Sequence, residues 1–215
     1  MDIGNLAIWA VMGITALVSF KGFDNVYFFR KYDFHIGSIR AGEQYRMFTS
    51  AFLHADPMHL IFNMYALYLF GFDVIWGMGV LEFVIIYFAS LICGNLLTLY
   101  FHKNDLFYRA IGASGAVMGV MYSSIVMFPD KQLLLFFAIP MPSYILGIGY
   151  LLYSIYGMRA KADNIGHTAH FGGAIGGLAF TLCKRPELFQ TNTLVVVLLI
   201  IPIIILFFMA RSGKI

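Results

Sequence analysis

The sequence predicts an all-α protein, a bundle of helices that crosses a membrane several times. Of its 215 residues 60% are hydrophobic and 12% are charged, and the mean hydropathy is +0.81. Ordinary soluble domains carry about twice that share of charged residues, so the composition excludes that class. The net charge of +3 is spread over the loops, and without a basic run it indicates no nucleic-acid partner.

Seven apolar stretches are each near the length that crosses about 30 Å of hydrocarbon at roughly 1.5 Å per residue. The first has no basic flank before it and no Ala-x-Ala-like site after it, so we expect it to stay as a span rather than a cleaved signal. The predicted spans are 5–20, 58–77, 80–101, 113–128, 142–158, 167–183 and 193–210.

The connections between spans differ in character. The segment from Lys21 to Pro57 mixes basic and aromatic residues, a pattern typical of a loop that lies in the membrane interface. In the segment 129–141 and just after it, Pro140 and Pro142 should stop any helix from running through. Without repeats or low-complexity tracts, the sequence predicts one domain over 1–215, with a core of about 5–183 and an extra span of about 193–210.

Two polar residues stand at the start of the second span. His59 and Asn63 are four residues apart, so both side chains lie on one face of the helix and can donate hydrogen bonds toward one point. The alternative is that they only bind neighbouring helices, and spacing alone does not decide between the two. His54 is expected to hold the loop that enters this span.

A serine and a histidine, each among glycines, are the strongest indication of chemistry. Ser114 begins the fourth span inside Gly-Ala-Ser-Gly, where a helix N-terminus offers free N–H groups to a developing oxyanion. His170 lies near the start of the sixth span, and the pairs Gly173/Gly177 and Gly172/Gly176 allow a close helix contact there. The imidazole could then reach the hydroxyl, as a base reaches its nucleophile. The alternative for Ser114 is an N-cap on a packing helix.

Three motifs in order make the chain similar to the rhomboid family of intramembrane serine proteases. They are the loop and second-span signature from Gln44 to Met64, the G-x-S-G at 112–115, and the A-H-x-x-G-x-x-x-G that starts at Ala169. The resemblance implies a catalytic Ser114–His170 dyad, with His59, Asn63 and the Ser114 amide as the oxyanion hole, and a layout of six spans plus one at the C-terminus. It also implies single-span membrane proteins as substrates, and no cofactor or metal.

Three positions depart from the family pattern. Tyr45 stands where the family often has tryptophan, and Met118 stands four residues after the serine, where the family often has an aromatic that packs on the catalytic histidine. Only Asp73 lies where the family usually has a glutamate, and we expect it to have no part in the chemistry. His167, one turn before His170, is expected to be solvated or to cap its helix.

Other functions fit the sequence less well. A zinc protease would need H-E-x-x-H, which is absent, and an aspartyl protease needs two carboxylates within spans, whereas Asp73 and Glu82 lie at a turn. A carrier would need inverted repeats or charged pairs at mid-depth. A catalytically silent relative that binds transmembrane helices would be expected to lose the serine or the histidine, and this chain keeps both.

The family topology conflicts with the distribution of basic residues. With the N-terminus inside, three Lys/Arg lie within (Lys131, Lys184 and Arg185) and eleven lie outside, the reverse of the positive-inside rule. We follow the family topology, because five of the eleven charges are in the first loop, which is expected to lie in the membrane interface and so need not obey the rule. We also expect a location in the cytoplasmic membrane of a bacterium. The eleven are Lys21, Arg30, Lys31, Arg40, Arg46, Lys103, Arg109, Arg159, Lys161, Arg211 and Lys214.

Overall fold

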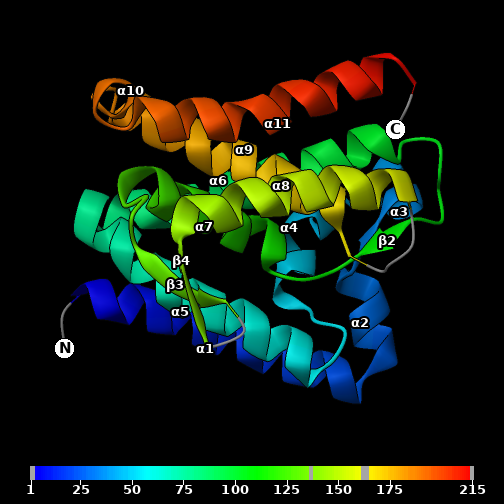
Figure 1. Ribbon diagram of the computed structural model, residues 1–215. Coiled ribbons are helices and arrows are strands. Elements are labelled where there is room, and N and C mark those ends of the chain that lie inside the picture. The colour runs from blue at the N-terminus through cyan, green and yellow to red at the C-terminus, as the bar shows by residue number, and fades with distance from the viewer. Residues whose placement is uncertain (1–2, 136–137, 161–164, 214–215) are drawn as a thin grey trace.

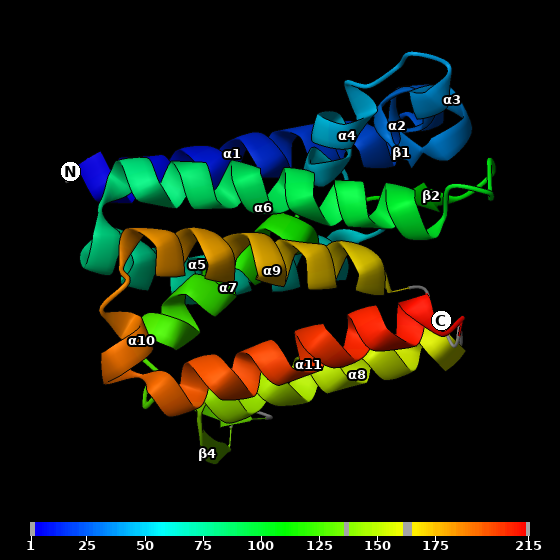
Figure 2. The same cartoon turned by 90° about the horizontal axis from the view of Figure 1, so that it is seen from above.

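The computed structural model describes residues 3–135, 138–160 and 165–213. Lys161 and Lys214, two of the charges counted above, lie outside this part of the chain. Within it, seven helices of 14 residues or more pack side by side (Figures 1 and 2). They are α1 (Ile3–Asp24), α5 (Pro57–Met78), α6 (Val80–Phe101), α7 (Ser114–Met127), α8 (Ser143–Ala160), α9 (His167–Lys184) and α11 (Thr193–Arg211).

Each long helix falls on a predicted span. Most edges agree within two residues, but α1 continues four residues beyond the predicted end. Its last turn carries Lys21, whose ammonium lies 4.6 Å from the centre of the Phe28 ring. The long side chain carries the charge away from the helix axis, so the helix continues past this residue. The first and last described residues lie at opposite ends of the bundle, as an odd number of spans requires (Figure 2).

Four of these helices are long and apolar enough to cross a membrane by length and composition: Leu6–Asp24, Pro57–Met78, Val80–Phe101 and Thr193–Arg211. The other three lie between α6 and α11 in the chain. Helix α7 is shorter, at 14 residues, and α9 carries polar residues in its first turns. Ser114 and His170, which the sequence singled out, lie in the first turns of two of these three helices. The fold is therefore a polytopic helical membrane bundle, as predicted.

The segment between α1 and α5, which the sequence predicts as an interfacial loop, folds into a series of short elements. In it, β1 pairs antiparallel with β2, which precedes α7, and places Phe34 opposite Ala110. A second antiparallel pair, β3 with β4, connects α7 to α8. The short elements are α2 (Val26–Tyr32), β1 (Phe34–His35), α3 (Ile36–Arg40), α4 (Arg46–Thr49), η1 (Ser50–Phe52), β2 (Arg109–Ala110), β3 (Gln132–Leu135), β4 (Ile139–Pro142) and α10 (Leu188–Thr191).

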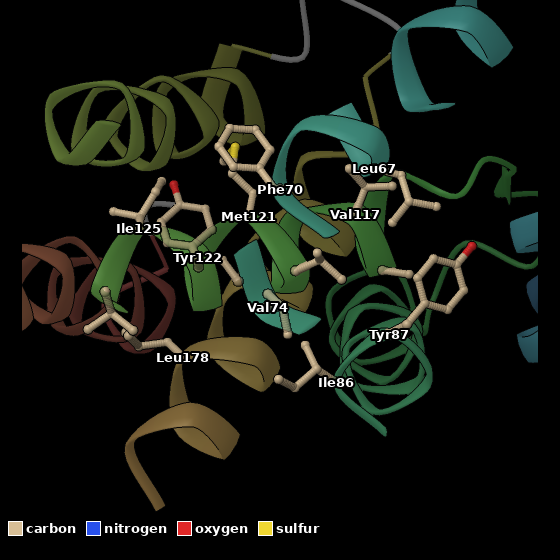
Figure 3. Close-up of a cluster of buried hydrophobic side chains, with 14 of the residues drawn as sticks. Leu67, Phe70, Val74, Ile86, Tyr87, Val117, Met121, Tyr122, Ile125 and Leu178 are labelled. Atoms are coloured by element: carbon tan, nitrogen blue, oxygen red, sulfur yellow. The ribbon is translucent and has the colours of Figure 1, made fainter. Parts of the chain in front are cut away.

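Helix α7 lies at the centre of the bundle. Twelve of its 14 residues are buried, and side chains from α5, α6 and α9 pack around it (Figure 3). The two that are not fully buried, Ser114 and Met118, lie one turn apart and so share a face. A central helix with one open face at its N-terminal end can present a side chain to a cavity while the rest of it stays packed.

The two glycine pairs of α9 lie against different neighbours. A Cβ added at Gly172 would lie 2.7 Å from the carbonyl oxygen of Cys93 on α6, and one added at Gly173 would overlap the carbonyl oxygen of Gly115 on α7. The same holds one turn later, where Gly177 lies directly against the backbone of α7. Because no side chain separates these backbones, α9 packs closely against α6 and α7 at once.

Candidate active site

Ser114 and His170 meet across the contact between α7 and α9. The Nε2 of His170 lies 2.5 Å from the Oγ of Ser114, although the residues are 56 positions apart in the sequence. Each side chain lies in the first turns of its helix, and the glycine contact described above brings those two turns together. His170 is 8% exposed, so its imidazole is largely shielded from solvent, while Ser114 is half-buried. A hydroxyl and an imidazole at this distance form the contact that general-base activation of a nucleophile needs.

The pair opens into a cavity of about 830 Å³. Its walls come from α5, α7, α8, α9 and the segment around β2, and most of the lining surface is apolar. The polar side chains that line it are, from the helices, those of His59, Asn63, Ser114, Tyr150 and His170, and, from the segment around β2, those of Tyr108 and Arg109. An apolar pocket with a few convergent polar groups is the usual form of a site that binds and transforms a ligand.

His59 is held so that one nitrogen can donate toward the serine. Its Nδ1 accepts the backbone N–H of Ala55 at 3.3 Å, so the neutral ring carries its hydrogen on Nε2. A Cβ on Gly112 would lie 3.0 Å from that Nε2 and 3.7 Å from the Oγ of Ser114, so both atoms border the same point. Gly112 has a φ of +115° and is crowded by His59, so no larger residue fits there without strain.

Asn63 also lines the cavity, one turn further along α5. It is 6% exposed, and its Nδ2 donates to the carbonyl of His59 at 2.9 Å. An amide nitrogen has two hydrogens, so this bond leaves one for a group in the cavity. Ser114 itself opens α7, and the backbone N–H groups of a first helical turn have no acceptor within the helix. The structure thus brings His59, Asn63 and the Ser114 amide to one cavity.

The sequence suggested that His54 holds the loop that enters α5, and the structure adds a contact next to Ser114. Its ring is fully buried, and Nε2 accepts the backbone N–H of Ala113 at 3.3 Å, directly before Ser114. Nδ1 lies 2.9 Å from the Oγ of Ser19 on α1, which donates to the carbonyl of Phe52. Burial, followed by the nearby His59, lowers the pKa of His54 to about 3, so the ring stays neutral and can accept.

We expect this histidine to make the protein sensitive to acid. The unfolded chain protonates His54 near the ordinary value of 6.5 and the native chain only near 3, so the unfolded state binds more protons between these values. The free energy of unfolding should therefore be highest above pH 6.5 and fall as the pH is lowered toward 3. Thermal denaturation in detergent between pH 7.5 and 4 should show a steeper loss for the wild type than for His54→Gln. Parallel curves would contradict the assignment.

A buried carboxylate ties the first loop to the segment that leads into Ser114. Asp33 is 1% exposed; its Oδ1 accepts from the Nη1 of Arg46 at 3.0 Å, and its Oδ2 from the Nη1 of Arg109 at 2.7 Å. Arg46 also donates to Glu43 and to two backbone carbonyls. Because a buried ion pair loses several kcal/mol when one partner is removed, this cluster should keep β2, and with it the cavity wall, in place.

Two expectations about neighbouring residues have different outcomes. His167 is 4% exposed and packs edge-on against Tyr153 with ring centres 5.4 Å apart, so the prediction of a solvated histidine is wrong, and that of a capping histidine stays a prediction. Its ring fits because Gly157 has no side chain.

Asp73 accepts from Ser124 at 2.5 Å and from Lys131 at 2.6 Å. This cluster lies toward the far end of α7 from Ser114, and Asp73 is not among the described residues that line the cavity. That Asp73 has no part in the chemistry stays a prediction.

Fold and site together define the class: a polytopic helical membrane protein in which a serine and a histidine from two helices share a cavity. Residues 41–187 match the Rhomboid domain family. The chain belongs to the rhomboid family.

Curated relatives agree with this assignment. RHOMBOID-like protein 12, mitochondrial, from Arabidopsis thaliana is 29% identical over 184 residues, which cover 78% of this chain and 55% of that protein. Rhomboid protein 1, mitochondrial, from Saccharomyces cerevisiae is 30% identical over 61% of this chain and 39% of its own length. Rhomboid-like protease 1 from Toxoplasma gondii is 29% identical, with 70% and 50% covered. The chain therefore spans about half the length of these relatives.

Proposed function

We propose that this protein is a serine endopeptidase that cleaves single-span membrane proteins within the membrane. The observation that carries the proposal is the 2.5 Å contact between the His170 Nε2 and the Ser114 Oγ, two residues that line a cavity. Membership of the rhomboid family supports it, as does the similarity to a protein named as a protease. The chemistry uses side chains and backbone amides only, without a cofactor or a metal.

In the first half of the reaction, the Ser114 Oγ bonds to the carbonyl carbon of the scissile peptide while its proton passes to the His170 Nε2. The carbonyl π electrons move to the oxygen, whose negative charge would be held by His59 Nε2–H, an Asn63 amide hydrogen and the Ser114 N–H. Collapse of this intermediate breaks the C–N bond, and the leaving nitrogen takes the proton from His170. The N-terminal fragment stays as an ester on Ser114.

In the second half, water replaces the amine. His170 takes a proton from the water as its oxygen bonds to the ester carbon, and the same donors stabilise the oxyanion. The C–O bond to Ser114 then breaks, and the serine oxygen takes the proton back from His170. The products are two peptides and the original enzyme, so one histidine acts first as base and then as acid in each half.

The oxyanion donors can be tested separately from the dyad. We expect His59→Ala and Asn63→Ala each to lower turnover by about 10²–10³, with little change in KM, because these donors act mainly on the charge that develops in the transition state. Initial rates over a range of substrate concentrations measure both parameters. If KM rises while turnover stays the same, the two side chains bind substrate or hold the helix and do not stabilise an oxyanion.

The substrate class calls for a direct experiment. The purified protein in liposomes is incubated with a panel of single-span membrane proteins, and the fragments are mapped by mass spectrometry. We expect cuts near small or helix-breaking residues, because a peptide bond inside an intact helix is shielded from attack. Specific binding of these substrates without any fragment would favour the alternative, a catalytically silent membrane protein that binds transmembrane helices.

Location and orientation are part of the proposal. A bacterial cytoplasmic membrane was expected from the sequence, but the three relatives described above come from eukaryotes and two of their names say mitochondrial, so they give that location no support. Membrane fractionation of the native host measures the location. Reporter fusions at the C-terminus measure the orientation: a signal outside the membrane supports the family topology, and a signal inside supports the positive-inside rule.

A further inference from the structure

The second nitrogen of His170 has a partner that the sequence did not indicate. The hydroxyl of Tyr150, on α8, lies 2.6 Å from the His170 Nδ1, and the two rings have centres 5.8 Å apart. The imidazole therefore lies between Ser114 on Nε2 and Tyr150 on Nδ1. Both Tyr150 and His170 line the cavity, and they come from helices that pack against each other.

The direction of this bond follows from what Ser114 requires. The Nε2 of His170 can accept the serine proton only when it carries no hydrogen, so the hydrogen of the neutral ring must be on Nδ1. The Nδ1–H then donates to the oxygen of Tyr150. As the serine proton arrives on Nε2, the ring becomes positively charged and this bond becomes charge-assisted and stronger. In this tautomer the Tyr150 oxygen is the acceptor for the His170 Nδ1–H, and the bond would stabilise the charge that develops on the ring.

The position of Tyr150 is itself determined by packing. One turn earlier on α8, the carbonyl of Gly147 accepts a hydrogen bond of 2.5 Å from the hydroxyl of Tyr122, a fully buried residue of α7. Gly147 also lets Ile125 of α7 approach, because a Cβ there would lie 3.0 Å from the Ile125 Cδ1. Helix α8 is therefore held against the same helix that carries Ser114.

We propose that Tyr150 is a positioning residue for the Ser114–His170 dyad, acting through the His170 Nδ1. The inference rests on the proposed function. It gives this chain an orienting group where it lacks an aromatic at position 118, since Met118 cannot stack on His170 as a ring does. The described residues that line the cavity include no carboxylate, so the acceptor on the cavity side is a neutral phenol. In serine proteases with a triad, a carboxylate performs this task.

Tyr150→Phe tests the inference, because it keeps the ring and removes only the hydroxyl. We expect kcat to fall about 10- to 100-fold with KM unchanged, the size expected when a hydrogen bond to a developing charge is lost. Labelling of Ser114 by a small fluorophosphonate should slow by a similar factor, since it needs the same activated serine but no bound peptide. The matched control is Tyr156→Phe, which removes a hydroxyl from an exposed position of the same helix and should leave both rates unchanged.

A measurement that does not depend on activity separates this inference from the proposed function. In protein labelled with ¹⁵N-histidine, the His170 signal, assigned with a His170→Ala sample, should show the Nδ1–H tautomer in the wild type and a mixture in Tyr150→Phe. An unchanged tautomer, an unchanged kcat, or a rise in KM alone would overturn the role of Tyr150. A wild type that neither cleaves nor labels would refute the proposed function, while the tautomer would still decide on Tyr150.

Discussion

Ser114→Ala is expected to remove proteolysis, lowering the rate of cleavage by at least about 10⁴-fold. The variant lacks the hydroxyl oxygen that lies 2.5 Å from the His170 Nε2, so no acyl intermediate can form at position 114. Ser114 lines the cavity and alanine removes only its hydroxyl, while the glycine contacts that hold α7 against α9 remain, so the fold should survive. Fragment formation from a cleavable substrate in liposomes and the thermal midpoint in detergent measure the two effects.

The matched control is Ser212→Ala, at the exposed C-terminal end of α11, which should cleave like the wild type. A Ser114→Ala protein with the wild-type rate would show that another group is the nucleophile and that the dyad assignment is wrong. If the variant loses its thermal transition along with its activity, Ser114→Cys gives a second measurement, since a thiol keeps a nucleophile of similar shape at that position.

The second large effect is expected at the glycines of α9. In Gly173→Leu and Gly177→Leu the new side chain meets the backbone of α7, so α9 must move away and carry His170 with it. A displacement of about 1 Å can cost on the order of 10²-fold in rate, and overpacking should lower the thermal midpoint by roughly 5–10 °C. Turnover and thermal denaturation in detergent, measured on the same samples, show both changes.

The structure also predicts how a smaller substitution at Gly177 compares with leucine. Gly177→Ala should be milder than leucine, but it should already be measurable, because its Cβ alone overlaps the carbonyl oxygen of Gly119. The control is Gly13→Leu on α1, where nothing lies within 4 Å of an added Cβ, and it should retain rate and stability. Wild-type cleavage by both leucine variants would mean that α9 does not pack through these glycines.

Periodicity and length were enough to place the helices, because each span is a property of consecutive residues. The apolar stretch 193–210 and the helix Thr193–Arg211 differ by one residue at the end. Spacing along the sequence also predicted that His59 and Asn63 share one face of a helix, and both line the same cavity. The glycines beside Ser114 and His170 likewise predicted, from the sequence alone, that the two helix backbones lie in close contact.

The supporting residues could not be predicted in this way. His54 and Ala113 are 59 positions apart, and Asp33 and Arg109 are 76 apart, so no window of sequence contains both partners. Tyr150 is one of several tyrosines on α8, and nothing in its spacing distinguishes it from Tyr156. These roles arise from how helices and loops pack, and packing is set by the whole chain rather than by a repeat.

The backbone contact between α9 and α7 limits how this chain can change by mutation over generations. At Gly157 the facing group is the side chain of His167, so a larger residue there could be tolerated after a second change that trims its neighbour. At Gly173 and Gly177 the facing groups are the carbonyl oxygens of Gly115 and Gly119, which every amino acid has. No second-site substitution can remove them. A substitution of either glycine therefore cannot be compensated by a second substitution, and it persists only if the protein tolerates it alone.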